Sequence, residues 1–311
     1  MTISSRVMAA VLLAGLAAGW AGPVPMVRAQ EAQTPAAKTA DSKPSDAKPS
    51  DAKPSDAKPS DAKPADPGAA GAATSDQATK TAAACEVPEY LQTSESKLDR
   101  VAEAVKGPRR LDILVVGSRS SMLSGPDGSG TSYPARLEVA LRDKLPGVTV
   151  SVATDLQVKR TAAEVAEGLE NLAKERKPTL VIWQTGTIDA VRAIDPDDFR
   201  TAINDGVAGL QNAGTDVLLM NLQYSPRMET MITVAPYLDN MRVGAQEHNV
   251  PLFDRFALMR YWNENGLFDL FNTHHGFGLA KRVHECLGQA LAAFVIEAAH
   301  LGPAPADKVQ H

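Results

Sequence analysis

Five short apolar runs alternate with longer amphipathic segments in the second half of this chain. They lie at 111–116, 148–153, 180–183, 217–220 and 250–253. Runs that are continuous, rather than alternating with polar residues, are typical of parallel strands covered on both faces. The order of runs and amphipathic segments therefore predicts an α/β domain. Its doubly wound, mostly parallel five-stranded sheet would be flanked by helices in three layers, as in flavodoxin-like folds.

The segments between the runs have helical periodicity, with apolar residues recurring every three or four positions. The predicted helices span 135–145, 162–175, 199–213, 228–248 and 279–300. Pro236 weakens the fourth of them, because proline lacks the amide that a helix interior needs. Ligands of doubly wound sheets bind beyond the carboxyl ends of the strands. We therefore expect the site in the loops after Val116, Ala153, Trp183 and Met220.

The N-terminal segment predicts export. Arg6 precedes an apolar run over 7–20, and a small-residue cleavage site follows at 27–29. This layout is typical of a signal peptide over residues 1–29, and about 14 apolar residues are too few for a permanent membrane span. An uncleaved anchor is the alternative. We expect a periplasmic or secreted protein that does not span a membrane once the signal is removed.

Residues 30–84 predict a disordered linker. They are mainly Ala, Lys, Pro, Ser and Asp, with a Lys-Pro-Ser-Asp-Ala unit that recurs from Lys43 onward. Such a stretch offers no large apolar side chain to bury, and its regular prolines block helix formation. It is either a tether or filler of variable length. With a disordered tail predicted at 302–311, the folded domain is residues 85–301.

Charge and cysteine content limit the partners of that domain. The net charge of −5 and the absence of a basic block argue against nucleic acid, and no cofactor motif or convincing metal-ligand set is present. Cys85 and Cys286 stand near the two ends of the domain. In an oxidising compartment they can form a disulfide, with two unpaired thiols as the alternative.

Five stretches of the domain resemble a known family. The loop 116–121 reads Val-Gly-Ser-Arg-Ser-Ser, and Tyr-Pro-Ala-Arg-Leu follows at 133–137. Further matches lie at 181–190, 221–227 and 253–260, and the contexts of Cys85 and Cys286 fit as well. Together they resemble the exported bacterial SGNH (GDSL-type) hydrolases over essentially the whole domain. The resemblance implies an SGNH-like fold and an ancestral acyl or acetyl ester hydrolase.

The resemblance also shows where the catalytic positions are altered. Arg119 stands where the family has its serine nucleophile, flanked by Ser118 and Ser120. A guanidinium stays protonated and cannot attack an ester. Ile188 stands where an asparagine would donate to the oxyanion, and losing such a donor costs roughly 10²- to 10³-fold. The family's glycine-containing second loop is replaced by Thr-Asp-Leu-Gln-Val-Lys at 154–159.

The C-terminal Asp-x-x-His segment is altered too. Asn272 and His275 keep its spacing, which makes His275 the candidate base and Asn272 its weaker orienting partner. A count back from Cys286 gives a different register, and His274 and His275 without any role remain the alternative. Asp189 and Tyr224 are candidate substrate-binding residues, with an ion pair and aromatic packing as their ordinary interpretations.

Two functions stay open at this point. The first is a degenerate relative with weak or lost catalysis, whose cleft binds a small-molecule ester or a glycan and whose Arg119 holds an anion. The second is an active ester hydrolase with a shifted serine, Ser120 or Ser118, and His275 as base. Altered positions that act as one unit are hard to repair jointly, which favours the first.

Overall fold

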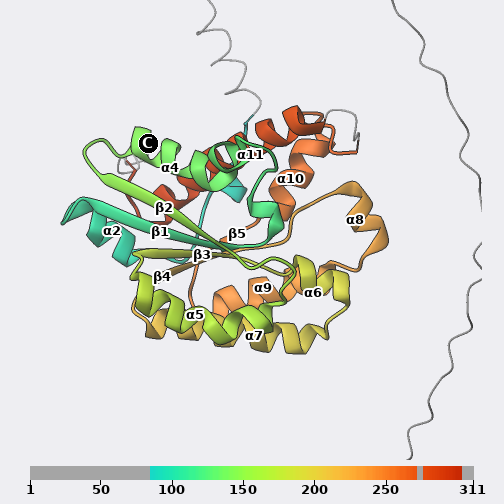
Figure 1. Ribbon diagram of the computed structural model, residues 1–311, viewed down its shortest axis with the longest axis horizontal. Coiled ribbons are helices and arrows are strands. Elements are labelled where there is room, and N and C mark those ends of the chain that lie inside the picture. Colours follow the sequence, from blue (N-terminus) through green and yellow to red (C-terminus); the bar gives the residue numbers. More distant parts are fainter. Residues whose placement is uncertain (1–84, 272–275, 303–311) are drawn as a thin grey trace, which may run out of the picture. The chain divides into compact units, whose positions relative to one another are not determined.

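The computed structural model describes residues 85–271 and 276–302. The predicted signal peptide, linker and most of the predicted tail lie outside these residues. The described chain forms a five-stranded parallel sheet in the order β2-β1-β3-β4-β5 (Figure 1). The strands are β1 (Arg110–Gly117), β2 (Thr149–Leu156), β3 (Leu180–Gln184), β4 (Asp216–Met220) and β5 (Leu252–Phe253). The predicted doubly wound α/β fold is confirmed.

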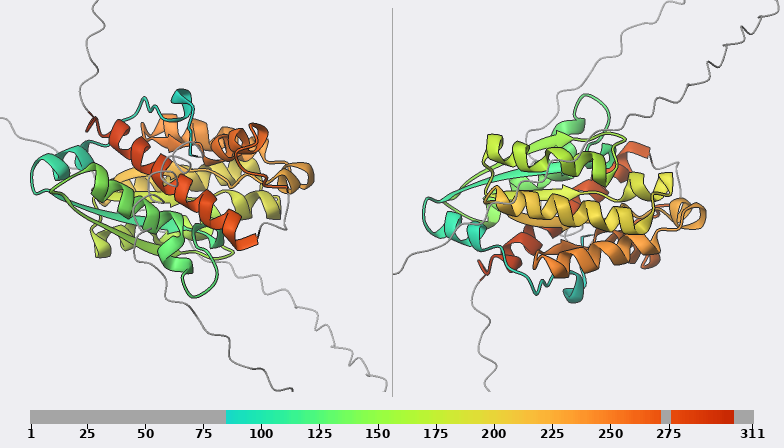
Figure 2. Two further views of the ribbon diagram at one scale, coloured as in Figure 1. Left: turned by 90° about the horizontal axis from the view of Figure 1, so that it is seen from above. Right: turned by 90° about the horizontal axis from the view of Figure 1, so that it is seen from below.

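Helices cover both faces of the sheet, so the domain has three layers. The helices on one face are α4 (Tyr133–Lys144) and α11 (Gly276–Ala298), which pack against each other; those on the other are α5 (Ala162–Arg176), α7 (Pro196–Asn212) and α9 (Ala235–Glu247) (Figures 1 and 2). The remaining helices are η1 (Glu89–Leu91), α2 (Asp99–Lys106), η2 (Arg119–Ser121), α3 (Gly128–Thr131), α6 (Thr187–Arg192), α8 (Pro226–Met231) and α10 (Arg255–Glu264). Both faces of β3 are buried, as its continuous apolar run predicts.

Capping residues set several of the helix boundaries. Thr161 and Glu164 form a reciprocal capping box at the start of α5. That arrangement satisfies backbone amides that have no partner within the helix. At α7, Asp195 accepts from the amide of Asp197, and Pro196 occupies the first turn. The helix therefore begins three residues before the predicted start at Phe199.

The prediction of a single helix over 228–248 is wrong. The chain forms α8 and then α9, with Ile232, Thr233 and Val234 between them. Pro236 lies in the first turn of α9, where its missing amide costs nothing because that amide has no helical partner. Proline thus marks a helix start here rather than a weak point within a helix.

Strand β2 departs from the prediction of full burial. It lies at the edge of the sheet, and only Val150 among its residues is fully buried. The run predicted at 148–153 does form a strand. It reads Val-Thr-Val-Ser-Val-Ala, so polar residues alternate with apolar ones, and Thr149 and Ser151 are exposed, as an edge position allows. The short helices α2, α6 and α10 were not predicted, because segments of six to ten residues give a weak periodic signal.

A disulfide joins the beginning of the domain to its last helix. Cys85 and Cys286 are bonded, with their Cα atoms 4.9 Å apart. The segment after Cys85 is also held by the indole of Trp262, whose Nε1 donates to the carbonyl oxygen of Glu86 at 2.8 Å. These links fix residues 85 to 88 against the helical layer of α11 and α10.

Candidate ligand-binding site at the carboxyl ends of the strands

A groove lies beyond the carboxyl ends of β1, β2 and β3. Its cavity measures about 470 Å³. The lining residues come from the three loops that follow these strands: Ser118, Arg119, Ser120, Val158, Lys159, Thr187 and Ile188. Three of the four loops expected to form the site therefore meet here. Ser118, Ser120 and Arg119 all contribute to the lining, as expected for residues that follow β1.

The turn after β1 needs a glycine. A Cβ at Gly117 would lie 2.1 Å from the Oγ of Ser121, which is fully buried beneath the groove. Ser118 and Ser120 are half-buried, and their hydroxyl oxygens are 3.2 Å apart. Because Gly117 has no side chain, the chain turns closely enough here for the hydroxyls of Ser118, Ser120 and Ser121 to lie together at the end of β1.

Gln184, the last residue of β3, connects these serines. Its Oε1 accepts from the amide and the hydroxyl of Ser118, both at 3.0 Å, and from the hydroxyl of Ser121 at 2.9 Å. The Ser120 hydroxyl is a fourth donor at 3.5 Å. A carbonyl oxygen has two lone pairs, so it cannot satisfy four donors at once. The serine hydroxyls therefore share Gln184 with other acceptors: Ser118 and Ser120 can donate to each other, and Ser121 can donate to the hydroxyl of Tyr133.

Arg255, the first residue of α10, lies under the groove with an exposed fraction of 0%. Its guanidinium donates to the Oγ of Ser120 at 3.1 Å, to the carbonyl of Ser120 at 3.3 Å and to Oε1 of Gln223 at 3.3 Å. It also lies 5.6 Å from the ring centre of Tyr133. Burial lowers the pKa of Arg255 to about 10, so the group still carries its charge at neutral pH.

His284 on α11 completes this buried polar cluster. Its Nδ1 accepts from the amide of Tyr133 at 2.9 Å. Burial, and then the charge of Arg255, lower the pKa of His284 to about 3. Burial also raises the pKa of Tyr133, whose hydroxyl is 3.0 Å from the Oγ of Ser121. Both groups are therefore neutral at physiological pH, and their contacts fix the start of α4.

The pKa of His284 predicts a pH dependence of stability. The unfolded chain binds a proton at His284 below about pH 6.5, whereas the folded chain stays unprotonated there down to about pH 3. The free energy of unfolding is therefore not reduced by this group above about pH 6.5. Between about pH 6.5 and pH 3, protonation of His284 in the unfolded chain lowers it by about 1.4 kcal/mol per pH unit. In urea denaturation, we expect the free energy of unfolding to drop by about 2 kcal/mol more for the native protein than for His284→Asn between pH 7 and pH 5.

Asparagine is the matched replacement because its side-chain oxygen can accept from the Tyr133 amide as Nδ1 does. Equal losses of stability in the two proteins over this range would show that His284 is not the titrating group.

Arg119, which was predicted at the position of the family nucleophile, lines the groove with an exposed side chain. Its guanidinium donates to the hydroxyl of Ser124 at 2.9 Å. Ile188, which was predicted at the position of the family's oxyanion donor, also lines the groove with its aliphatic side chain. The hydroxyl of Thr187 next to it is buried and has no hydrogen-bond partner among the described residues.

Two predicted substrate-binding residues are not placed in the groove. Asp189 is buried, and its Oδ1 accepts from the amide of Ala162 at 2.8 Å, which fixes the start of α5. Burial raises the pKa of Asp189. Tyr224 is buried against Phe256 in an edge-to-face pair with ring centres 5.2 Å apart. Tyr224 therefore has the aromatic packing role that was its alternative interpretation, whereas Asp189 holds a backbone amide and forms no ion pair with a described residue.

The predicted base and its partner, His275 and Asn272, lie outside the described residues, as does His274. Gln184, Arg255 and His284 were not predicted from the sequence. Gln184 follows directly on the apolar run 180–183, which is the position where a doubly wound sheet presents its functional side chains. That positional signal could have found Gln184, whereas Arg255 lies two residues beyond its run and gives no such signal.

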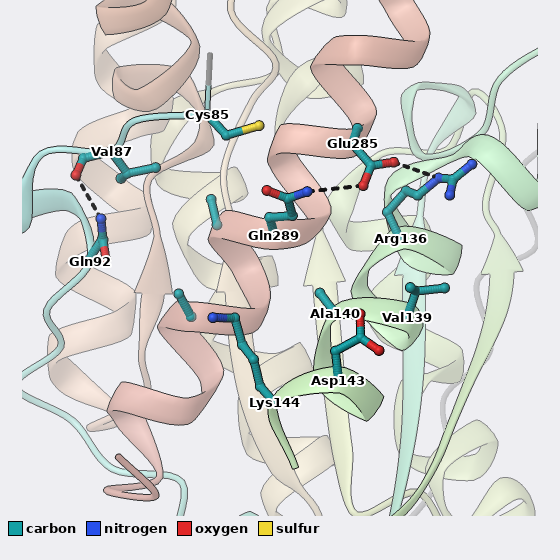
Figure 3. Close-up of a pocket in the computed structure, with 12 residues that line it drawn as sticks. Cys85, Val87, Gln92, Arg136, Val139, Ala140, Asp143, Lys144, Glu285 and Gln289 are labelled. Atoms are coloured by element: carbon teal, nitrogen blue, oxygen red, sulfur yellow. Dashed lines mark hydrogen bonds and ion pairs between the residues drawn. The ribbon is translucent and has the colours of Figure 1, made fainter. Parts of the chain in front are cut away.

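A second cavity, of about 380 Å³, lies elsewhere on the molecule (Figure 3). It is formed by the segment after Cys85 together with α4 and α11, and it shares no lining residue with the groove. Its Arg136 is paired with Glu285 at 2.9 Å, and Glu285 accepts from Gln289 at 3.1 Å. None of its lining residues comes from a loop that follows a strand, so this cavity is not the candidate site.

The sheet order and the loops that meet at the strand ends define a doubly wound α/β domain with a groove at the carboxyl ends of its strands. A model of the non-GDSL lipase-like family matches residues 84–301. The chain belongs to this family, and the SGNH (GDSL-type) hydrolase relationship predicted from the sequence is confirmed. Among proteins with curated descriptions, none matches the sequence.

Several solved structures of esterases and lipolytic proteins are similar to the chain. TesA is 19% identical, with 58% of this chain and 99% of TesA covered and a TM-score of 0.46. A lipolytic protein of the G-D-S-L family from Desulfitobacterium hafniense is 16% identical, covering 60% and 99%, with a TM-score of 0.43. An acetylxylan esterase from Geobacillus stearothermophilus is 19% identical, covering 60% and 93%, with a TM-score of 0.45.

Proposed function

We propose that this chain is an exported, periplasmic or secreted relative of acyl or acetyl ester hydrolases, with weak or lost catalysis, whose groove binds a small-molecule ester or a glycan. One observation carries the proposal. Among the described residues, the hydroxyls of Ser118 and Ser120 contact each other, Gln184 and Arg255. None of these groups is a base that could accept the serine proton.

Ester hydrolysis by a serine requires that its hydroxyl be activated. A serine hydroxyl is a weak nucleophile until an adjacent base removes its proton. At Ser120 the adjacent group is a guanidinium that donates, so it cannot take the proton. Ile188 donates nothing to a developing oxyanion in the same groove. Among the described residues around the cavity, no base therefore contacts either serine, and position 188 supplies no side-chain donor to an oxyanion.

The localisation follows from the predicted signal peptide over residues 1–29. Within the residues that the structure describes, no helix has the length and apolarity that a membrane crossing requires. The paired cysteines fit an oxidising compartment, where a disulfide persists.

A second candidate function is an active ester hydrolase that uses Ser120. One observation favours this function: the guanidinium of Arg255 lies 3.1 Å from the Oγ of Ser120. A nearby positive charge stabilises the alkoxide form of a serine. This mechanism needs His275 as the base that removes the proton.

An activity assay separates the two functions. We expect the purified full-length chain to hydrolyse p-nitrophenyl acetate no faster than the Ser118→Ala/Ser120→Ala variant, and a fluorophosphonate probe to label neither protein. An authentic serine esterase, treated in parallel, shows that substrate and probe are competent. Labelling that disappears in Ser120→Ala or Ser118→Ala, with turnover that also disappears in His275→Ala, would establish the active hydrolase instead.

A further inference from the structure

Three cations gather around Ser120 without an acidic partner. Arg119 and Lys159 line the groove, and Arg255 lies beneath it in contact with Ser120. None of the three forms an ion pair with another described residue, and none of the described groove-lining residues is acidic. A buried guanidinium without a carboxylate is costly, because hydrogen bonds to neutral groups only partly replace its hydration.

Nearby carboxylates are already engaged elsewhere. Asp155 accepts from the side-chain amide of Gln157. Glu164 accepts from the amide of Thr161 at 2.7 Å and lies 3.6 Å from Arg192. Asp189 is buried at the start of α5. No carboxylate of the described chain is therefore placed to neutralise the cations of the groove.

Hydrogen-bond donors also outnumber acceptors at the base of the groove. Oε1 of Gln184 faces four donors, and Oγ of Ser120 receives a further one from Arg255. Nε2 of Gln184 and Nε of Arg255 are buried donors without a partner among the described residues. These two donors are closed off from solvent, so a ligand would instead accept from the half-buried hydroxyls of Ser118 and Ser120, and its negative charge would balance the cations of the groove.

Apart from Thr187, the rest of the groove lining is apolar. Val158 is 45% exposed, and with Ile188 it forms the aliphatic part of the lining. We propose that the groove binds a carboxylate next to an apolar group, with the carboxylate at Ser118 and Ser120, between Arg119, Lys159 and Arg255, and the apolar part over Val158 and Ile188. This inference rests on the proposed binding function of the groove and names its ligand class. A short acyl acid and an acidic sugar both have this chemistry.

Isothermal titration of the full-length chain at low ionic strength tests the proposal, with sodium hexanoate and sodium galacturonate as probes. Hexanamide and galactose are their neutral controls. We expect at least one carboxylate to bind about 10-fold or more tightly than its neutral control, because charged hydrogen bonds are roughly twice as strong as neutral ones. The better of the two carboxylates identifies the source as acyl or sugar. Equal binding of acid and neutral control in both pairs overturns the proposal.

Variants locate the site. Arg119→Ala/Lys159→Ala should weaken carboxylate binding by roughly 5-fold, a modest loss because exposed charges are screened. Ser120→Ala should weaken it by about 10-fold, because a donor is lost and Arg255 is left exposed to the groove without its acceptor. The matched control is Arg200→Ala, which removes a surface arginine paired with Glu247 and should leave the affinity unchanged.

The Arg119→Ala/Lys159→Ala and Ser120→Ala variants remove no side chain of the apolar core, so circular dichroism should show that both keep the native fold. Carboxylate affinity that is unchanged in both would overturn the proposal. The result is independent of the activity assay: ester hydrolysis together with carboxylate binding would refute the lost catalysis and leave the carboxylate site in place. Absence of both hydrolysis and carboxylate preference would refute the site alone.

Discussion

The Cys85→Ser/Cys286→Ser variant should unfold at markedly lower urea concentration than the native protein. The disulfide closes a loop with a sequence separation of 201 residues. On the chain-entropy model, a loop of this size restricts the unfolded state enough to contribute about 3–5 kcal/mol. For a domain of this length, that corresponds to a fall in melting temperature of roughly 10 °C.

Reduction of the native protein provides the matched control for that variant. Native protein in excess dithiothreitol should unfold at the same urea concentration as the double serine variant, and dithiothreitol should not affect the variant. A difference below about 1 kcal/mol between oxidised and reduced protein would mean that Trp262, through its bond to Glu86, and the packing of α11 hold the domain's beginning without the bridge.

The layered fold was predictable because its strands follow apolar runs. β3 and β4 match their predicted runs to within one residue at each end, since both are buried centrally in the sheet. β5 is only two residues long in the structure, although its run covers 250–253. An apolar run reports burial, and Val250 is buried before the ladder with β4 begins. At β5 the apolar run therefore predicts burial but not the extent of hydrogen-bond pairing.

The sequence predicted which loops form the site, but not which of their side chains face the groove. The turn after β1 and the segment at Ile188 were expected to meet, because the carboxyl ends of parallel strands share one edge. Asp189 illustrates the limit. Neighbouring residues on a short helix point to different sides, so Ile188 faces the groove while Asp189 faces the amide of Ala162. Sequence spacing alone could not assign those directions, since α6 itself was not predicted.

Arg255 was missed for a different reason. Arginine is mostly exposed in proteins, so a sequence position alone gives little reason to expect one at 0% exposure. Its burial depends on contacts from three separate segments, namely Ser120, Gln223 and Tyr133. Such long-range convergence has no local signature, and it is the feature from which the carboxylate site is inferred.

Gly288→Ala should destabilise the domain by about 2–3 kcal/mol, because it separates the two helices of one layer. A Cβ at Gly288 would lie 2.4 Å from the Cβ of Arg136 and 2.8 Å from the backbone nitrogen of Leu137. Backbone atoms of α4 cannot rotate away as a side-chain end would, so α4 and α11 must move apart. The cost of such overpacking exceeds the gain of about 1 kcal/mol that alanine brings to a helix interior.

Gly168→Ala in α5 is the control with the opposite sign. Gly168 is exposed, and nothing lies within 4 Å of a Cβ built there, so only the helix propensity changes. Alanine should raise the free energy of unfolding by roughly 0.5–1 kcal/mol. Urea denaturation of both variants measures the two effects on one scale. If both substitutions raised stability, the close contact between Gly288 and α4 would not exist in solution. The packing of α4 on α11 could then not explain how Tyr133, the first residue of α4, is held beside Arg255.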